Sequence, residues 1–255
     1  MNIIESFGIS GSGKTYFRKK INFRGVHSYR SFLYLALLRK KNLSLVERLS
    51  LFYFLFIKND FIKNIKSFFK YKKKNFEASK NLKKPMKNPF NIYKNICNKE
   101  YKRLKGKKLI FCKFVEKTID NLNCNKQIKK TLIFWFKEEF CSYYNFSNFN
   151  SKKITIFDSE GILQRLILYL YYSKENEHNY LIDNYIKLMP KIKYVLVFNV
   201  NKKFFEKKNH LDLKLNFMLQ KKIFLKIKNK ISTNYSNKIK FITNKNFLKK
   251  SFRYE

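Results

Sequence analysis

The segment GISGSGKT, residues 8 to 15, constrains this chain more than any other, because it holds three of the six glycines in the sequence. Gly8, Gly13, Lys14 and Thr15 match the pattern G-x-x-x-x-G-K-[ST] at every defined position. Such a loop wraps a phosphate chain with inward-facing backbone N–H groups, and Cβ atoms at its glycines would obstruct the wrap. The alternative is a flexible Gly/Ser turn followed by an accidental Lys-Thr pair.

The residues on either side predict the order strand, loop and helix that this motif requires. Apolar residues indicate a buried strand over residues 2 to 7, and residues 13 to 22 can form the following helix. The N-terminus of that helix adds a favourable dipole for an anion. We predict that Lys14 contacts the β- and γ-phosphates of ATP and that the Thr15 hydroxyl binds Mg²⁺. The residues predicted to bind the nucleotide here are Gly8, Ser10, Gly11, Ser12, Gly13, Lys14, Thr15 and Tyr16.

The composition indicates a folded, strongly basic protein. The 255 residues are 45% hydrophobic and 18% aromatic, which predicts one domain, 1–255, with a sizeable core. The net charge is +40, but only eight of the 57 basic residues are arginine, so codon bias can account for much of the charge. Arginine is the residue that grips phosphates with two parallel hydrogen bonds. The charge still predicts attraction of anionic substrates and nonspecific binding of nucleic acid at low salt.

Cysteine and histidine spacing predicts no zinc site, because the four cysteines lie far apart without a C-x-x-C pair. The sequence shows no signal peptide, which predicts reduced thiols and a cytoplasmic location. The most apolar run, residues 49 to 57, is about half of the ~20 residues that a membrane span requires. It predicts a buried helix, with a membrane-surface helix as the alternative, and no transmembrane segment is expected.

Apolar patterning outlines the rest of the chain. Nearly continuous β-branched runs predict further strands over residues 26–29, 152–158, 192–200 and 238–243. Helical periodicity predicts helices over 31–41, 44–57, 59–71, 90–119, 125–144, 160–172, 178–188, 201–209 and 211–232. This order predicts an α/β fold with a mostly parallel sheet of about five strands and a large helical insertion over residues 31–148. The lysine-rich stretch 72–89 is expected to be an exposed connection.

The sequence ITIFDSEG supplies acidic residues for a nucleotide site. Asp158 ends a hydrophobic strand, where its carboxylate could hold Mg²⁺ at the edge of the sheet beside the glycine-rich loop. Glu160 follows two residues later and could orient or deprotonate an attacking hydroxyl group. The alternative is that Asp158 or Ser159 caps the next helix and Glu160 only favours the helix dipole.

These features together resemble the P-loop kinases that act on thymidylate, nucleosides and small metabolites. The matching segments are residues 8–15, FDSEGILQR at 157–165 and MPKIKYVLVFNVNKKFFEKKNH at 189–210. The resemblance implies the three-layer P-loop NTPase fold, ATP and Mg²⁺ as cofactors, and phosphoryl transfer to a small-molecule acceptor. It implies that 31–148 forms the acceptor or lid region. It also implies a lid helix whose phosphate-binding arginines are replaced here by Lys207 and Lys208.

Replacement of the lid arginines by lysines weakens the expected stabilisation of transferring phosphates, because lysine lacks the planar fork of arginine. Arg165 is the candidate to supply the missing guanidinium, and a solvated surface position is the alternative. The predicted catalytic residues are therefore Lys14, Asp158, Glu160 and Arg165, with Thr15 and Asp158 as metal ligands.

Three other functions compete with a kinase. A GTPase would need an acid where the segment TNKNF has Phe247, so the guanine donors would find no carboxylate. An ATPase associated with nucleic acid would use the +40 charge but would need aromatic or arginine platforms along a groove. A protein that binds nucleotide as a regulator, without turnover, is the third alternative.

Overall fold

The computed structural model describes residues 2–9, 12, 14, 26–54, 89–146, 155–158, 161–192, 194–198, 216–237 and 239–243. Five short parallel strands pair in the order β2-β3-β1-β4-β5. Their bounds are β1 Asn2–Phe7, β2 Val26–Ser28, β3 Thr155–Asp158, β4 Tyr194–Val197 and β5 Lys240–Thr243. The strands predicted at 2–7, 26–29, 152–158, 192–200 and 238–243 are confirmed within the described residues.

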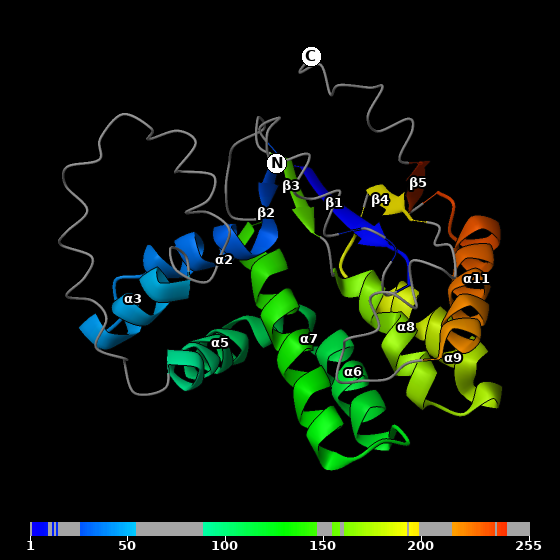
Figure 1. Ribbon diagram of the computed structural model, residues 1–255, viewed down its shortest axis with the longest axis horizontal. Coiled ribbons are helices and arrows are strands. Elements are labelled where there is room, and N and C mark those ends of the chain that lie inside the picture. The colour runs from blue at the N-terminus through cyan, green and yellow to red at the C-terminus, as the bar shows by residue number, and fades with distance from the viewer. Residues whose placement is uncertain are drawn as a thin grey trace.

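Helices make up most of the described chain. Their bounds are α2 Tyr29–Leu38, α3 Leu45–Phe52, α5 Pro89–Leu104, α6 Leu109–Asn121, α7 Lys126–Phe146, α8 Ile162–Tyr172, α9 His178–Leu188 and α11 Phe217–Asn234, with short 3-10 turns at Lys105–Lys108 and Glu175–Glu177. In the view of Figure 1 these helices gather below the strands. The helices predicted at 59–71 and 201–209 lie outside the described residues.

The predicted α/β fold class, a three-layer fold, is wrong, because the structure is mostly helical. The five paired strands are only three to six residues long, whereas the longest helix has 21 residues. Within the strands predicted over 152–158 and 192–200, the described strand residues are Thr155–Asp158 and Tyr194–Val197. Most buried core residues lie in the helices, whose aromatic side chains pack on one another, as Phe111 does on Phe136 and Tyr185.

One long helix predicted over residues 90–119 is also corrected, since it is two helices. α5 ends at Leu104, a 3-10 turn follows, and α6 begins at Leu109. Gly106 lies within this turn, and glycine costs a helix about 1 kcal/mol relative to alanine. Lys108, with φ −148° and ψ 53°, leaves the helical region and completes the break.

The hydrophobic core has two parts. The larger part joins β1 and β4 to α6, α7, α8, α9 and α11, and Phe7 of β1 meets Phe224 of α11 with ring centroids 4.9 Å apart. The smaller part lies among α2, α3, α5 and α7 around Tyr34, Phe54 and Tyr93. Apolar and aromatic burial of this kind is the main favourable contribution to folding.

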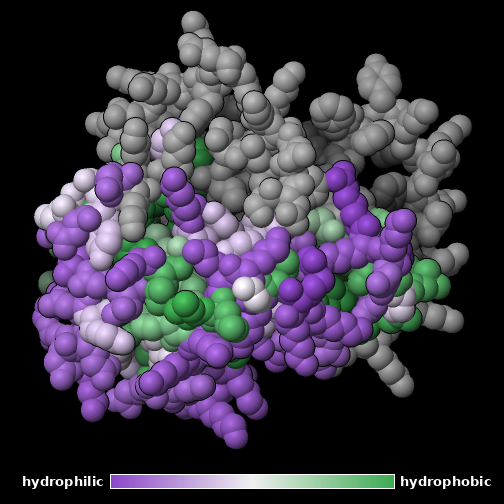
Figure 2. All heavy atoms as spheres, turned by 180° about the vertical axis from the view of Figure 1, so that it is seen from behind, coloured by the Kyte–Doolittle hydropathy of each residue, from purple (hydrophilic) through white to green (hydrophobic). Residues whose placement is uncertain are grey.

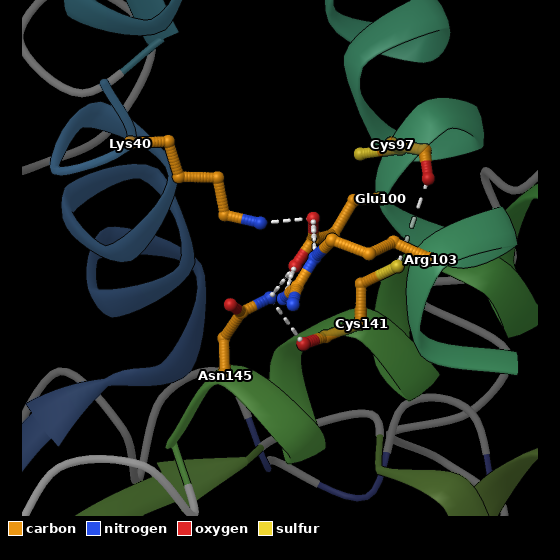
Figure 3. Close-up of polar contacts among 6 residues, drawn as sticks. All are labelled: Lys40, Cys97, Glu100, Arg103, Cys141 and Asn145. Atoms are coloured by element: carbon orange, nitrogen blue, oxygen red, sulfur yellow. Dashed lines mark hydrogen bonds and ion pairs between the residues drawn. The ribbon is translucent and has the colours of Figure 1, made fainter. Parts of the chain in front are cut away.

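A buried polar cluster around Glu100 ties α5 to the end of α2 and to α7 (Figure 3). The Glu100 carboxylate accepts hydrogen bonds from Arg103 Nε at 3.0 Å and from Asn145 Nδ2 at 2.9 Å, and it forms an ion pair with Lys40. Burial acts to raise the pKa of Glu100, but the hydrogen bonds from Arg103, Lys40 and Asn145 outweigh burial and lower it to about 2.

This cluster predicts a specific acid sensitivity. A carboxylate with a lowered folded-state pKa stabilises the fold above its unfolded pKa and loses that contribution as the pH falls toward its folded value. We expect Glu100→Gln to cost on the order of 3 kcal/mol near neutral pH, and the difference from wild type to shrink between about pH 4.5 and pH 2. Urea unfolding of both proteins across this range measures the difference. A difference that does not change with pH would contradict the prediction.

Candidate functional site

The glycine-rich loop begins at the carboxyl end of β1, the strand between β3 and β4. Gly8 donates its backbone N–H to Gln164 Oε1 of α8 at 2.9 Å. A Cβ atom at Gly8 would lie 2.6 Å from the carbonyl oxygen of Phe198, and Phe198 is itself held by a 2.8 Å hydrogen bond from its N–H to Phe7 O. Only glycine therefore fits where the chain leaves the strand.

Lys14 folds back over the start of this loop. Its Nζ atom donates to the carbonyl oxygens of Gly8 at 2.6 Å and Ile9 at 2.9 Å, and lies 3.2 Å from Ser12 Oγ. The Ser12 N–H reaches Ile9 O at 3.3 Å and closes a turn between them. Lys14 has helical backbone geometry, and the rest of the helix predicted over residues 13–22 lies outside the described residues. The ammonium group thus lies against the inside of the turn. Its three N–H donors could form hydrogen bonds to an anion bound there.

Asp158 ends β3, the strand beside β1. The two strands run parallel, and their register pairs Glu5 with Asp158. The carboxyl ends of parallel strands meet at one edge of a sheet, so the backbone of Asp158 is at the same edge as the loop. Because Asp158 is paired with Glu5, three residues before Gly8, its backbone is offset from Gly8 by about 10 Å along the strand direction.

Glu5 is a buried carboxylate in the interior of β1, with 1% of its surface exposed. Its Oε2 accepts a hydrogen bond from the N–H of Leu163, in the first turn of α8, at 3.0 Å. A carboxylate in this position satisfies a helix N–H that would otherwise lack a partner and is favoured by the helix dipole. Glu5 therefore fixes α8, and with it Gln164, against the strand that carries the loop.

The Glu5 charge also acts on a neighbouring tyrosine. Burial, with the Glu5 charge as a second cause, raises the pKa of the Tyr143 hydroxyl to about 12.

Gly161 makes this contact sterically possible. A Cβ atom there would lie 2.3 Å from Glu5 Cδ and 2.4 Å from Glu5 Oε2. Glu5 could move away only by giving up its hydrogen bond to Leu163. We expect Gly161→Ala to lower the free energy of unfolding by about 1–3 kcal/mol, the usual cost of overpacking.

Gly106→Ala is the matched control for this substitution, because a Cβ atom at Gly106 would meet no atom within 4 Å. Chemical unfolding of the two variants and wild type makes the comparison. Equal stability of the two variants would contradict the steric role of Gly161.

Arg165 is also positioned by α8, but its contacts are internal. The side chain is 4% exposed, its Nε donates to Glu139 Oε1 at 2.7 Å, and Nη2 contacts the same oxygen. The guanidinium lies 4.7 Å from the ring centroid of Trp135. The solvated surface position considered for Arg165 is wrong, and the predicted contact with phosphates stays a prediction in competition with this buried ion pair.

The remaining predicted site residues lie wholly or partly outside the described residues. Of Asp158 only the backbone is described, and the predicted residues outside the described part of the chain are Ser10, Gly11, Gly13, Thr15, Tyr16, Glu160, Lys207 and Lys208. The structure therefore brings together Gly8, Ser12 and Lys14, with the backbone of Asp158 on the neighbouring strand. Among the described residues no group of histidine, cysteine, aspartate or glutamate has a metal-binding arrangement.

Sequence reasoning missed two residues of this site, Glu5 and Gln164. Glu5 is the lone acid in the strand NIIESF, and an acid inside a buried strand indicates that it has a polar partner elsewhere in the fold. Gln164 gave no comparable signal, since a glutamine on a helix is ordinarily solvated.

Comparison with known proteins assigns the chain to no family. No family model, curated protein sequence or solved structure matches the chain significantly.

The described helices include none that is both long and apolar enough to cross a bilayer. On the face drawn in Figure 2, hydrophilic residues cover most of the described surface, with limited hydrophobic areas between them.

Proposed function

We propose that this protein binds ATP with Mg²⁺ at residues 8–15 and transfers the terminal phosphoryl group to a small-molecule acceptor, the activity of the P-loop kinases. The observation that carries this proposal is the position of Lys14. Its ammonium group lies against the Gly8 and Ile9 carbonyl oxygens, inside the turn at the end of the central strand. A lysine that served only solubility would extend into solvent instead.

The described residues fit a phosphate chain in two respects. The close approach of Gly8 to Phe198 leaves no room for a side chain, which keeps the backbone of the loop bare. The Lys14 ammonium group can exchange its carbonyl partners for phosphate oxygens, which adds the attraction between opposite charges to the hydrogen bonds. When bound, MgATP supplies the phosphoryl group, and its metal would be held by Thr15 and Asp158.

The chain's own residues would contribute mainly position and charge. Lys14 would neutralise the β- and γ-phosphates, and Glu160 would orient or deprotonate the acceptor hydroxyl. Glu5 and Gln164 would keep α8 against the loop strand, so that the loop does not have to order itself at each turnover.

A nucleotide-binding regulator without turnover is the second candidate, and the observation that favours it is the engagement of Arg165 by Glu139. The two candidates separate by titrating the protein with ATP in the presence of Mg²⁺ or EDTA. Binding with rapid ATP consumption in the presence of nucleosides, nucleotides or sugars supports the kinase. Binding without turnover supports the regulator, and absence of Mg²⁺-dependent binding rejects both.

A further inference from the structure

A basic groove lies between residues 37–47, α5 and α7, apart from the glycine-rich loop. Two adjoining hollows of about 750 and 550 Å³ lie against α3 and α5 and share Glu47 and Lys99 on their walls. Lys102 and Lys137 line the larger hollow, and Lys41 lines the smaller one. We define the basic groove by these five residues.

The two acids in these hollows are already satisfied. Glu47 accepts from Ser44 N at 2.9 Å through Oε2 and from Lys99 Nζ at 2.9 Å through Oε1, which completes the N-cap of α3. Glu100, at the wall of the smaller hollow, is held by Lys40, Arg103 and Asn145 (Figure 3). Neither carboxylate is therefore paired with the three other lysines of the groove.

Lys41, Lys102 and Lys137 form no ion pair within the described part of the chain. Lys137 is half-buried, donates to Asn98 Oδ1 at 3.2 Å and lies 5.3 Å from the ring centroid of Tyr101. Burial is the main cause of its lowered pKa; the Glu116 carboxylate acts to raise that pKa, and the charges of Lys105 and Lys102 lower it further. A partly desolvated ammonium group gains more from an anion than a solvated lysine does.

Amide side chains complete the lining of the larger hollow. Asn95 and Asn98 stand one turn apart on α5, beside Lys99 and Lys102. Residues three and four apart on a helix share a face, so these side chains form one row of cations and amide donors. Such a row can follow successive phosphate groups, with the lysines supplying charge and the amides supplying hydrogen bonds.

We propose that the basic groove is a second anion site, independent of the glycine-rich loop, that takes a ligand with several linked phosphate groups. The shared chemistry is a polyphosphate or phosphodiester chain, supplied either by a free polyphosphate or by single-stranded nucleic acid. Concavity distinguishes this groove from the many other lysines, because lysines on a convex face cannot converge on one ligand.

The test uses the full-length chain carrying Lys14→Met, which disables the loop as a competing phosphate site. Inorganic tripolyphosphate and a labelled twenty-residue oligothymidylate are titrated separately at several salt concentrations. The groove variant carries Lys102→Gln and Lys137→Gln, which keep the aliphatic stems. We expect it to bind at least about tenfold more weakly. For the oligonucleotide, the plot of log K against log salt has a negative slope. The magnitude of this slope should decrease by roughly 0.7 for each phosphate that the variant no longer neutralises.

The matched control carries Lys113→Gln and Lys117→Gln, two exposed lysines of α6 that change the net charge equally. Selective weakening of binding in the groove variant supports the site. If the groove then binds tripolyphosphate but not the oligonucleotide, the ligand is a free polyphosphate. If the groove binds the oligonucleotide tightly, the ligand is nucleic acid. Equal weakening in groove and control variants, or no binding of either probe at low salt, would overturn the proposal.

Discussion

Replacing Lys14 by methionine is expected to weaken the binding of MgATP by about 10- to 100-fold and to slow any phosphoryl transfer by at least about 100-fold. Methionine keeps a similar length and apolar volume but cannot donate to the carbonyl oxygens of Gly8 and Ile9 or to a phosphate. Each hydrogen bond to a charged group contributes about 1.5–3 kcal/mol, which sets the expected loss of affinity.

The measurement is isothermal titration of MgATP into wild type, Lys14→Met and a control, Lys113→Met. Lys113 is exposed on α6, so its loss changes the charge without touching the loop. Thermal unfolding of the three proteins checks that the fold survives. An unchanged affinity in folded Lys14→Met would remove the basis of the proposed function.

Replacing Arg165 by methionine is expected to have the largest effect on stability, about 3–5 kcal/mol, because it breaks the buried ion pair with the Glu139 carboxylate. The loss of the guanidinium face on Trp135 adds to the cost. For a chain of this length 1 kcal/mol corresponds to about 2–4 °C in Tm, so the Tm should fall by roughly 10 °C.

The double variant Arg165→Met with Glu139→Met separates structure from catalysis. Replacing both partners by apolar groups of similar volume recovers much of the stability, because no charge is then left buried. If Arg165 only supports the fold, the double variant should regain ATP binding and turnover along with its Tm. Recovery of stability without turnover would restore the catalytic role predicted from the sequence.

The sequence predicted local features well, for physical reasons that act over a few residues. The strand 2–7 and its exit at Gly8 follow from apolar patterning and from the need for a bare backbone. The helix begun at Ser44 follows from a capping box in which Ser44 and Glu47 satisfy each other's backbone N–H. Such signals depend on neighbours in sequence, so they can be found without a structure.

Features that depend on distant partners were missed or mistaken. The sequence left open a surface position for Arg165, and only its contact with Glu139, 26 positions away, shows that it is buried. Glu5 and Leu163 are 158 positions apart, so the role of Glu5 could not be found from its neighbours. The balance between helix and sheet was mistaken for the same reason, because strand length depends on pairing across the fold.

By itself, the sequence determined where the chain must be bare, charged or apolar: a glycine-rich turn ending in Lys14, a set of amphipathic helices, and a large excess of lysine. Tertiary structure alone decided which charges are buried in pairs, which lysines line a groove, and how far helices replace the sheet in the core. The physical reason is range, since propensity and capping act within a few residues, whereas burial and charge pairing depend on which distant segments come together.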